Sequence, residues 1–273
     1  MSVRVEGLSF TYPGGAQALR QVSLDVPSGT QVALVGENGA GKTTLAKVMC
    51  GLLRPDAGRV WVGDWDAREH SAAQLARRVT YVFQNPDDQL FERTVQAEVA
   101  FGPRNLGLPL EEIEQRLTRS LETFHLEGLR SRHPYELTPT QRKFLALAAA
   151  DAMQAPLIIL DEPTTGLDGP GLHVLNEYLA RKRREGPTIL AISHDMDFIA
   201  EQFERVVVMS GGEILADASA AQVFGAADLL AAGHLEAPQM VRLAERLGWQ
   251  VRPLTVEAVV VELMARPSAE VVR

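Results

Sequence analysis

The sequence predicts an α/β protein with a parallel-rich core sheet, an antiparallel N-terminal β subdomain, a helical insert and a C-terminal helical extension. Short apolar strands alternate with helices along much of the chain, which is typical of a parallel sheet covered on both faces. Residues 3–34 instead alternate apolar and polar positions between Pro and Gly turns, as antiparallel strands do. Residues 84–136, and the chain from about residue 218, lose the strand rhythm and are predicted to be helical.

The N-terminal half supplies the first run of elements. Its alternation and turn residues place Pro13-Gly14-Gly15 between two strands, and a glycine-rich loop follows the third strand. The predicted strands are 3–12, 19–26, 31–35, 59–62 and 79–83, and the predicted helices are 43–52 and 72–78. The insert holds a further helix, predicted at 111–124, whose charges lie on one face.

The β/α rhythm returns with predicted strands at 157–160, 188–193 and 205–209, and Gly211-Gly212 makes a hairpin turn. We therefore expect a main domain at 1–217, with a helical subdomain at about 84–155, and an extension at 218–273. The basic run 181–184 ends a predicted helix, where it complements the helix dipole and is expected to face water.

Composition restricts the classes of function. The 273 residues are 46% hydrophobic and 23% charged, with a formal net charge of -8, which argues against nucleic acid as a partner. The one cysteine, Cys50, fits a reducing compartment and is expected to pack in the core. We expect neither a signal peptide nor a membrane-spanning helix, so a membrane role requires a partner.

A phosphate-binding loop is predicted at 36–43, where the residues GENGAGKT follow the apolar strand QVALV and open a helix. Its backbone N–H groups and the helix N-terminus favour phosphate oxygens. Lys42 would reach the β- and γ-phosphates, and the Thr43 hydroxyl would bind Mg²⁺. The chain is therefore predicted to have the P-loop NTPase fold.

A second motif, LIILDE at 157–162, is an apolar strand that ends in two carboxylates. Asp161 would hold the Mg²⁺ shell directly or through water, and Glu162 would take a proton from the attacking water or orient it. A strand that simply ends in a polar turn is the alternative.

His194 and Gln84 close other predicted strands, at the sheet edge where ligands gather. Either a structural role or a contact with the γ-phosphate suits His194. Tyr12 precedes the first turn, where it could stack on a base or pack on the core.

The segment LTPTQ, residues 137–141, begins the next apolar helix. Thr138 is a good N-cap, Pro139 suits the first helical position, and Gln141 completes a capping box. By itself this pattern predicts an ordinary helix start.

Taken in order, GENGAGKTT, FQNP, LTPTQRK, LIILDEPTTGLD and ISHD resemble the Walker A, Q-loop, signature, Walker B with D-loop, and H-loop motifs of ATP-binding-cassette (ABC) ATPases. The resemblance covers nearly the whole chain and implies ATP and Mg²⁺ as cofactors. It implies catalytic roles for Glu162, His194 and Gln84, and Mg²⁺ ligation by Thr43, Gln84 and Asp161. The implied nucleotide-binding residues are Tyr12, Asn38, Gly39, Gly41, Lys42, Thr43, Thr44, Thr138, Gln141 and Asp168.

The Q-loop region FQNPDDQLFERTVQAEVAFGPRNLGL and the tail also resemble energy-coupling-factor (ECF) transporter ATPases, which import vitamins or transition-metal ions. This implies a peripheral protein on the cytoplasmic face of the cell membrane. Its implied partners are a second ABC ATPase, a transmembrane coupling protein and a substrate-capture protein.

The signature departs from the family's Leu-Ser-Gly-Gly-Gln. In that family two chains dimerise head to tail, and the signature of one covers the phosphate of the other. Pro139 lacks an N–H and Thr140 crowds the approach, so a heterodimer with a regular partner signature is favoured over a homodimer. The alternatives are a tolerated variant, an ATPase of another ABC transporter, and a weakly hydrolysing regulatory subunit.

Overall fold

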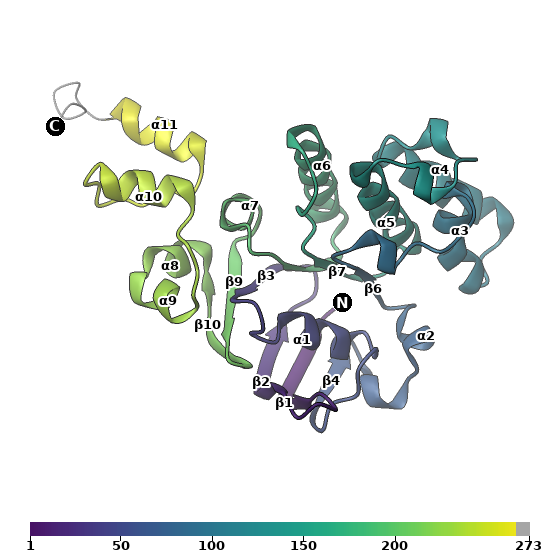
Figure 1. Cartoon of the computed structure of the whole chain (residues 1–273), viewed down its shortest axis with the longest axis horizontal. Helices are drawn as coiled ribbons and strands as arrows, with labels where there is room; N and C mark the ends of the chain where they lie inside the picture. Colours follow the sequence, from purple (N-terminus) through teal and green to yellow (C-terminus); the bar gives the residue numbers. More distant parts are fainter. Residues whose placement is uncertain (266–273) are drawn as a thin grey trace.

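The computed structural model describes residues 1–265, which form two sheets with helices around them (Figure 1). The strands are β1 (Val3–Thr11), β2 (Gln17–Val26), β3 (Gln31–Gly36), β4 (Ala57–Val62), β5 (Trp65–Asp66), β6 (Val79–Val82), β7 (Leu157–Asp161), β8 (Thr188–Ile192), β9 (Arg205–Ser210) and β10 (Glu213–Ser219). One sheet has the order β2-β1-β4-β5, and the other has the order β10-β9-β3-β8-β7-β6.

The smaller sheet is antiparallel throughout. It takes β1 and β2 from the alternating segment 3–34, together with β4 and β5, whereas β3 of that segment runs parallel in the larger sheet. Its apolar side chains share a core with one face of the larger sheet. In the larger sheet β9, β3, β8, β7 and β6 run parallel, and only the edge strand β10 is antiparallel. The five parallel strands therefore all end at one edge of the sheet.

Strands β7 and β8 are buried at every position, because alternate residues enter different cores. Ile159 packs toward the smaller sheet, and its neighbours Ile158 and Leu160 pack toward the helices on the other face. This double burial explains why the strands are continuous apolar runs in the sequence.

The α-helices are α1 (Lys42–Met49), α2 (Ala72–Leu75), α3 (Val95–Asn105), α4 (Leu110–Thr123), α5 (Pro139–Met153), α6 (Gly169–Glu185), α7 (Met196–Gln202), α8 (Ala220–Gly225), α9 (Ala227–Ala232), α10 (Gln239–Arg246) and α11 (Val256–Ala265). Figure 1 shows α1 beside the smaller sheet, and α3–α5 at the opposite end of the molecule from α8–α11. The predicted architecture of core sheet, antiparallel subdomain, helical insert and helical extension is confirmed.

Several boundaries differ from the sequence prediction by one to three residues, and two of these differences have a clear structural basis. The helix predicted at 72–78 is the single turn of α2, which a Ser71–Gln74 capping box begins. Strand β10 continues through Ser219, so helix begins at Ala220 rather than at residue 218. Hydrogen bonds to β9 hold these last strand residues, and the local sequence does not show them.

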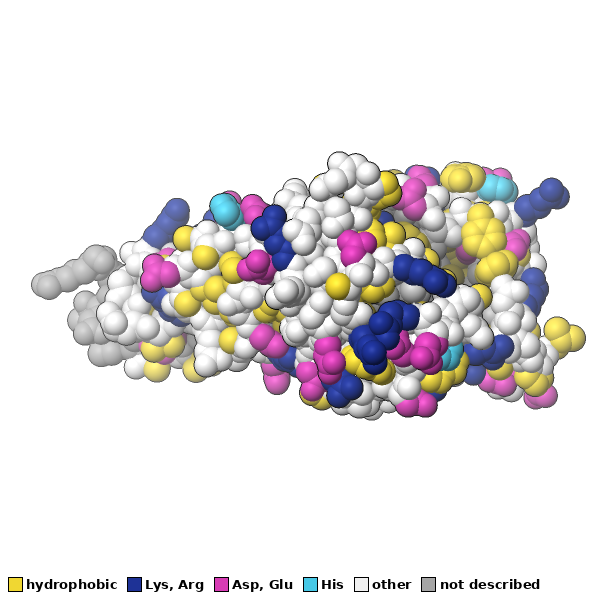
Figure 2. All heavy atoms as spheres, turned by 90° about the horizontal axis from the view of Figure 1, so that it is seen from below, with side chains coloured by type: hydrophobic (Ala, Val, Ile, Leu, Met, Phe, Trp, Pro, Cys, Tyr) yellow, Lys and Arg dark blue, Asp and Glu magenta, His cyan; other side chains and the backbone are white. Residues whose placement is uncertain are grey.

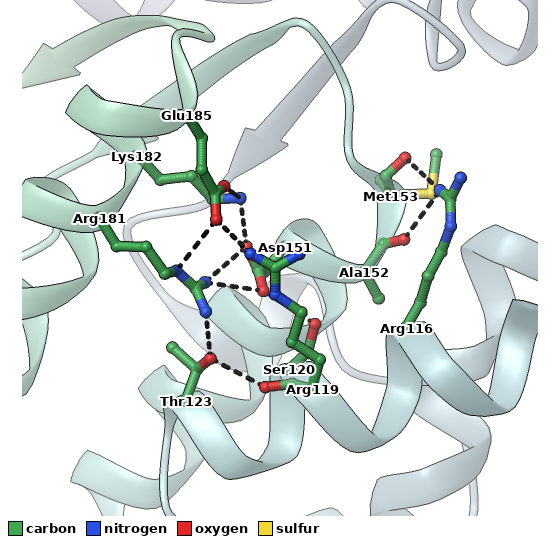
Figure 3. Close-up of polar contacts among 10 residues, drawn as sticks. All are labelled: Arg116, Arg119, Ser120, Thr123, Asp151, Ala152, Met153, Arg181, Lys182 and Glu185. Atoms are coloured by element: carbon green, nitrogen blue, oxygen red, sulfur yellow. Dashed lines mark hydrogen bonds and ion pairs between the residues drawn. The ribbon is translucent and has the colours of Figure 1, made fainter.

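The prediction that the basic run 181–184 faces water is wrong for its first two residues (Figure 3). Lys182 is only 5% exposed, and its ammonium lies 2.7 Å from a carboxylate oxygen of Asp151 on α5. Arg181 bonds the same carboxylate at 3.0 Å, and Ser120 of α4 donates to it at 2.9 Å. These side chains tie the insert to α6, because a buried carboxylate needs charged or polar partners.

Cys50 is buried as predicted, and burial raises the pKa of its thiol. Across residues 1–265, no helix has both the length and the apolar character needed to cross a bilayer. Figure 2 shows one face of the molecule, on which acidic and basic side chains are interspersed.

Candidate functional site

The carboxyl ends of four neighbouring strands bring the predicted site residues into one cavity of about 940 Å³. The P-loop (residues 36–43) follows β3, His194 follows β8, Asp161 and Glu162 end β7, and Gln84 follows β6. The predicted site residues that line the cavity are Tyr12, Asn38, Gly39, Gly41, Lys42, Thr43, Thr44, Gln84, Asp161, Glu162 and His194.

The P-loop leaves the N-terminus of α1 open to a ligand. The N-cap is Gly41, whose φ of 99° is left-handed, and no side chain caps the helix. A Cβ at this position would lie 2.4 Å from the carbonyl oxygen of Ala18, so the loop requires glycine here. The first N–H groups of α1 are therefore available to an anion, which the helix dipole also favours.

Lys42 lies within the same loop and is only 7% exposed. Its ammonium donates to the carbonyl oxygens of Gly36 and Glu37, at 2.8 Å each. Burial lowers the pKa of Lys42, while the carboxylates of Glu162, Asp161 and Glu37 act in the opposite direction. A phosphate in the loop would give this cation the anionic partner that its surroundings favour.

Asp161 has the surroundings expected of a carboxylate that binds a cation. One oxygen, Oδ2, accepts hydrogen bonds from the Thr43 hydroxyl, at 3.0 Å, and from the Tyr81 hydroxyl. The other oxygen, Oδ1, is buried and has no hydrogen-bond partner. An unpaired buried carboxylate oxygen beside a hydroxyl suits Mg²⁺, which prefers oxygen ligands. Tyr81 itself was not predicted, and burial raises the pKa of its hydroxyl, with Asp161 adding to the effect.

Glu162 and His194 form a direct pair across the ends of β7 and β8. Nδ1 of His194 lies 2.8 Å from Oε2 of Glu162, which also accepts the backbone N–H of His194 at 3.3 Å. Glu162 is 7% exposed, whereas the His194 side chain is 69% exposed and opens onto the cavity. The carboxylate is thus fixed, and the exposed imidazole is accessible to a ligand.

Tyr12 is 37% exposed at the rim of the cavity. Its ring packs edge-on against Phe10, with ring centroids 4.9 Å apart, and its hydroxyl lies 3.0 Å from the Thr44 hydroxyl. The residue thus packs on the subdomain and still presents a ring at the rim, so the two sequence interpretations are compatible.

Three predicted residues lie outside this cavity. Thr138 and Gln141 form the predicted capping box of α5: Oγ1 of Thr138 accepts the Gln141 N–H, and the Gln141 side chain accepts the Thr138 N–H. Asp168 caps α6 by accepting the Gly171 N–H at 2.9 Å. Within one chain, these side chains cap the N-termini of α5 and α6.

The structure adds residues that sequence reasoning missed. His234 of the extension lies 3.3 Å from the Glu37 carboxylate, and residues 234–237 help to line the cavity. Lys143 of α5 is 2% exposed and donates to the backbone carbonyls of Gln84 and Glu162. Burial lowers the pKa of Lys143 to about 8. For Lys143, the signal available in the sequence was a lysine within a mostly apolar helix.

The chain matches the ABC transporter family over residues 19–165. It is 40% identical over 269 residues to the energy-coupling factor transporter ATP-binding protein EcfA of Methanothermobacter thermautotrophicus, a match that covers 96% of this chain and 86% of the relative. It is 43% identical to an ABC transporter ATP-binding protein of Methanosarcina mazei, covering 89% of this chain but 41% of that longer protein.

The fold resembles CbiO1 of Clostridium perfringens, which is described as part of the ABC transporter complex CbiONQ. The two chains share 31% identity with a TM-score of 0.72, over 89% of this chain and 98% of CbiO1.

Proposed function

This chain belongs to the ABC transporter family of ATP-hydrolysing subunits, and on that premise we propose that it is the MgATP-driven motor subunit of an ECF-type importer for a vitamin or transition-metal ion. The observation that carries the proposal is the convergence of an open P-loop, the free Asp161 oxygen and the Glu162–His194 pair in one cavity. The similarity to a protein named EcfA supports the ECF assignment.

The site residues would have distinct roles in binding ATP, holding Mg²⁺ and activating water. The N–H groups of the P-loop and Lys42 would bind the phosphates, and Tyr12 would stack on adenine. Thr43, Asp161 and Gln84 would hold Mg²⁺, which supplies charge neutralisation on the phosphates when bound. Glu162 would orient the attacking water and take its proton, while His194 would hold the carboxylate through Nδ1 and face the γ-phosphate with its other ring nitrogen.

We propose a head-to-tail dimer in which the signature (residues 137–141) of one chain faces the nucleotide of the other. This signature would serve the partner's nucleotide poorly. Pro139 offers no N–H, and the capping box already uses the Gln141 N–H. The intact Lys42, Glu162 and His194 favour a heterodimer, in which a partner with a regular signature completes this chain's own site. The self-capped signature also supports the second candidate, a regulatory subunit with weak turnover.

The helical insert is the proposed contact with the membrane coupling protein, which would place the chain on the cytoplasmic face of the membrane. Its Phe91 and Phe101 are 63% and 40% exposed and form an edge-on pair with centroids 4.7 Å apart. Aromatic residues, Phe among them, are enriched at protein–protein interfaces relative to the rest of the surface.

Changing Glu162 to Gln tests the chemistry. The variant should bind MgATP normally, since the P-loop is unchanged, while turnover by the purified transporter complex falls by about 10²-fold or more. Glu213→Gln, an exposed site on β10, is the matched control and should keep full turnover. Unchanged turnover in Glu162→Gln would remove this carboxylate from its proposed role.

Charge reversals on the exposed face of the insert, together with Phe91→Asp, test the docking. These changes should release the ATPase from its membrane partner while nucleotide affinity stays unchanged, because the cavity lies on the core sheet. Co-purification with the membrane protein at normal stoichiometry would place the docking surface elsewhere.

A further inference from the structure

Lys143 is a buried cation two residues after the end of the signature (residues 137–141). It lies on α5 and is 2% exposed, on a helix whose other buried residues are apolar except for Asp151. Burial of a lysine is costly unless its ammonium finds partners. Packing alone therefore does not explain a lysine at this position, since Met would fill a similar volume.

The partners of Lys143 are main-chain carbonyl oxygens at the ends of two strands. Its Nζ donates to Gln84 at 2.9 Å, to Glu162 at 3.0 Å and to Phe83 at 3.4 Å. These carbonyls lie together because β6 and β7 are parallel neighbours. An ammonium has three N–H donors, so three carbonyls match its full capacity.

The bond to Glu162 holds a residue in an unusual conformation. Glu162 has a φ of 49°, in the left-handed region, which is costly for a residue other than glycine. Its N–H donates to the Ile192 carbonyl at 2.8 Å, and its own carbonyl accepts from Lys143 at 3.0 Å. The main chain is thus fixed on both sides of the Cα from which the carboxylate projects toward His194.

We infer that Lys143 is a positioning residue for ATP hydrolysis: its ammonium holds the Glu162 main chain and the start of the Q-loop at Gln84 against the signature helix α5. This inference rests on the proposed function, since it assigns Glu162 the reacting carboxylate. Lys143 touches neither nucleotide nor water in this scheme and acts through Glu162.

The same side chain joins the two nucleotide sites of the proposed dimer. Lys143 follows Thr140 by three residues on α5, so it moves with the segment that would face the partner's phosphate. Through the carbonyl of Glu162, a shift of α5 would change the placement of the carboxylate that serves this chain's own nucleotide. Lys143 therefore connects the signature, which would face the partner's nucleotide, with the Glu162 carboxylate, which would act on this chain's own nucleotide.

The first test replaces Lys143 with Met in the purified transporter complex. Loss of the bond to the Glu162 carbonyl, which then keeps only the Thr165 N–H at 3.2 Å, should let Glu162 relax. The kcat should then fall by about 10- to 10²-fold, as for a small misplacement of a reacting group. The KM for ATP should change by less than about twofold, because the P-loop is intact. Lys143→Arg keeps the charge and the donors and should recover most of the lost kcat.

Lys182→Met is the matched control, because Lys182 is also buried and lies on α6 with Asp151 as its partner. Removing it should lower thermal stability at least as much as Lys143→Met, while kcat per folded molecule stays at the parent value. If Lys143→Met does not fold, Lys143→Gln retains two donors on a shorter side chain and should show a partial loss of kcat.

A double-mutant comparison separates positioning from general packing. In a Glu162→Gln background, Lys143→Met should lower the remaining turnover by less than about threefold, because two residues that act as a unit give non-additive losses. Full additivity, or a kcat within about twofold of the parent in soluble Lys143→Met (in Lys143→Gln, if the Met variant does not fold), would overturn the inference. Lys42→Ala and Glu162→Gln serve as references: if they leave turnover unchanged, the proposed function itself fails.

Discussion

Helices α1 and α5 both begin at a segment that we propose faces a phosphate, and their N-termini are built in different ways. At α1 the N-cap is Gly41 and no side chain satisfies the first N–H groups. At α5 Thr138 and Gln141 form a complete capping box, and Pro139 removes one donor outright. The α1 terminus leaves its first donors for a ligand, whereas the α5 terminus lacks one donor at Pro139 and bonds the Gln141 N–H within the chain.

A helix start can therefore be stable without serving as an anion site. A capping box satisfies orphan N–H groups with the helix's own side chains, so an incoming phosphate gains little. The open terminus of α1 has no such compensation, and its loop is held instead by the Lys42 ammonium bonded to two loop carbonyls. We therefore expect phosphate affinity to concentrate at α1.

The largest expected effect comes from removing the cation at the open terminus. In the proposed heterodimer, Lys42→Ala should lower ATPase activity by about 10²-fold or more, since it removes charge stabilisation at the site that we propose is competent. The equivalent lysine-to-alanine change in the partner chain should be clearly milder, because that site would depend on this chain's capped signature. The ATP turnover of the two variant complexes, measured under the same conditions, tests this comparison. Equal losses of turnover would contradict the proposal that the two nucleotide sites differ in strength.

The open terminus could be predicted from sequence because its signals are local. The glycines, Lys42 and Thr43 follow an apolar strand directly, and Asp161 and Glu162 end another. Parallel strands of one sheet end at the same edge, so residues far apart in the chain were expected to converge there. The cavity gathers these residues in that way.

What could not be predicted depends on partners that lie far away in the sequence. Lys182 was expected to face water because a basic run at a helix end usually does, yet Asp151 on another helix buries it. The sequence around Lys143 did not indicate its carbonyl partners, because the register of β6 and β7 sets the position of these carbonyls. The contact of His234 with Glu37 likewise requires the path of the extension.

A smaller effect is expected from opening the capped terminus. Changing Pro139 and Thr140 to Gly restores one N–H and removes a branched side chain near the phosphate approach. Turnover should stay unchanged or rise by at most about twofold, since even a fully repaired second site would only equal the first. Stability should fall by about 1 kcal/mol per glycine, as measured by urea unfolding. A clear fall in turnover per folded molecule would show that the Pro-Thr pair has a positive role in catalysis.

The smallest expected effect concerns the cap itself. Thr138→Val keeps the shape of the side chain and removes the hydroxyl that accepts the Gln141 N–H at 3.2 Å. Loss of such a cap typically costs about 1 kcal/mol of stability. Ser219→Ala is the matched control, because Ser219 forms the same capping box with Gln222 at the start of α8. If the Thr138 hydroxyl serves mainly to cap α5, both variants should lose similar stability in urea unfolding and keep turnover within about twofold of the parent, as expected for changes outside a catalytic site. A turnover loss in Thr138→Val that approached that of Lys42→Ala would mean that the capped terminus binds phosphate as strongly as the open one, and the contrast between the two helices would then have no functional meaning.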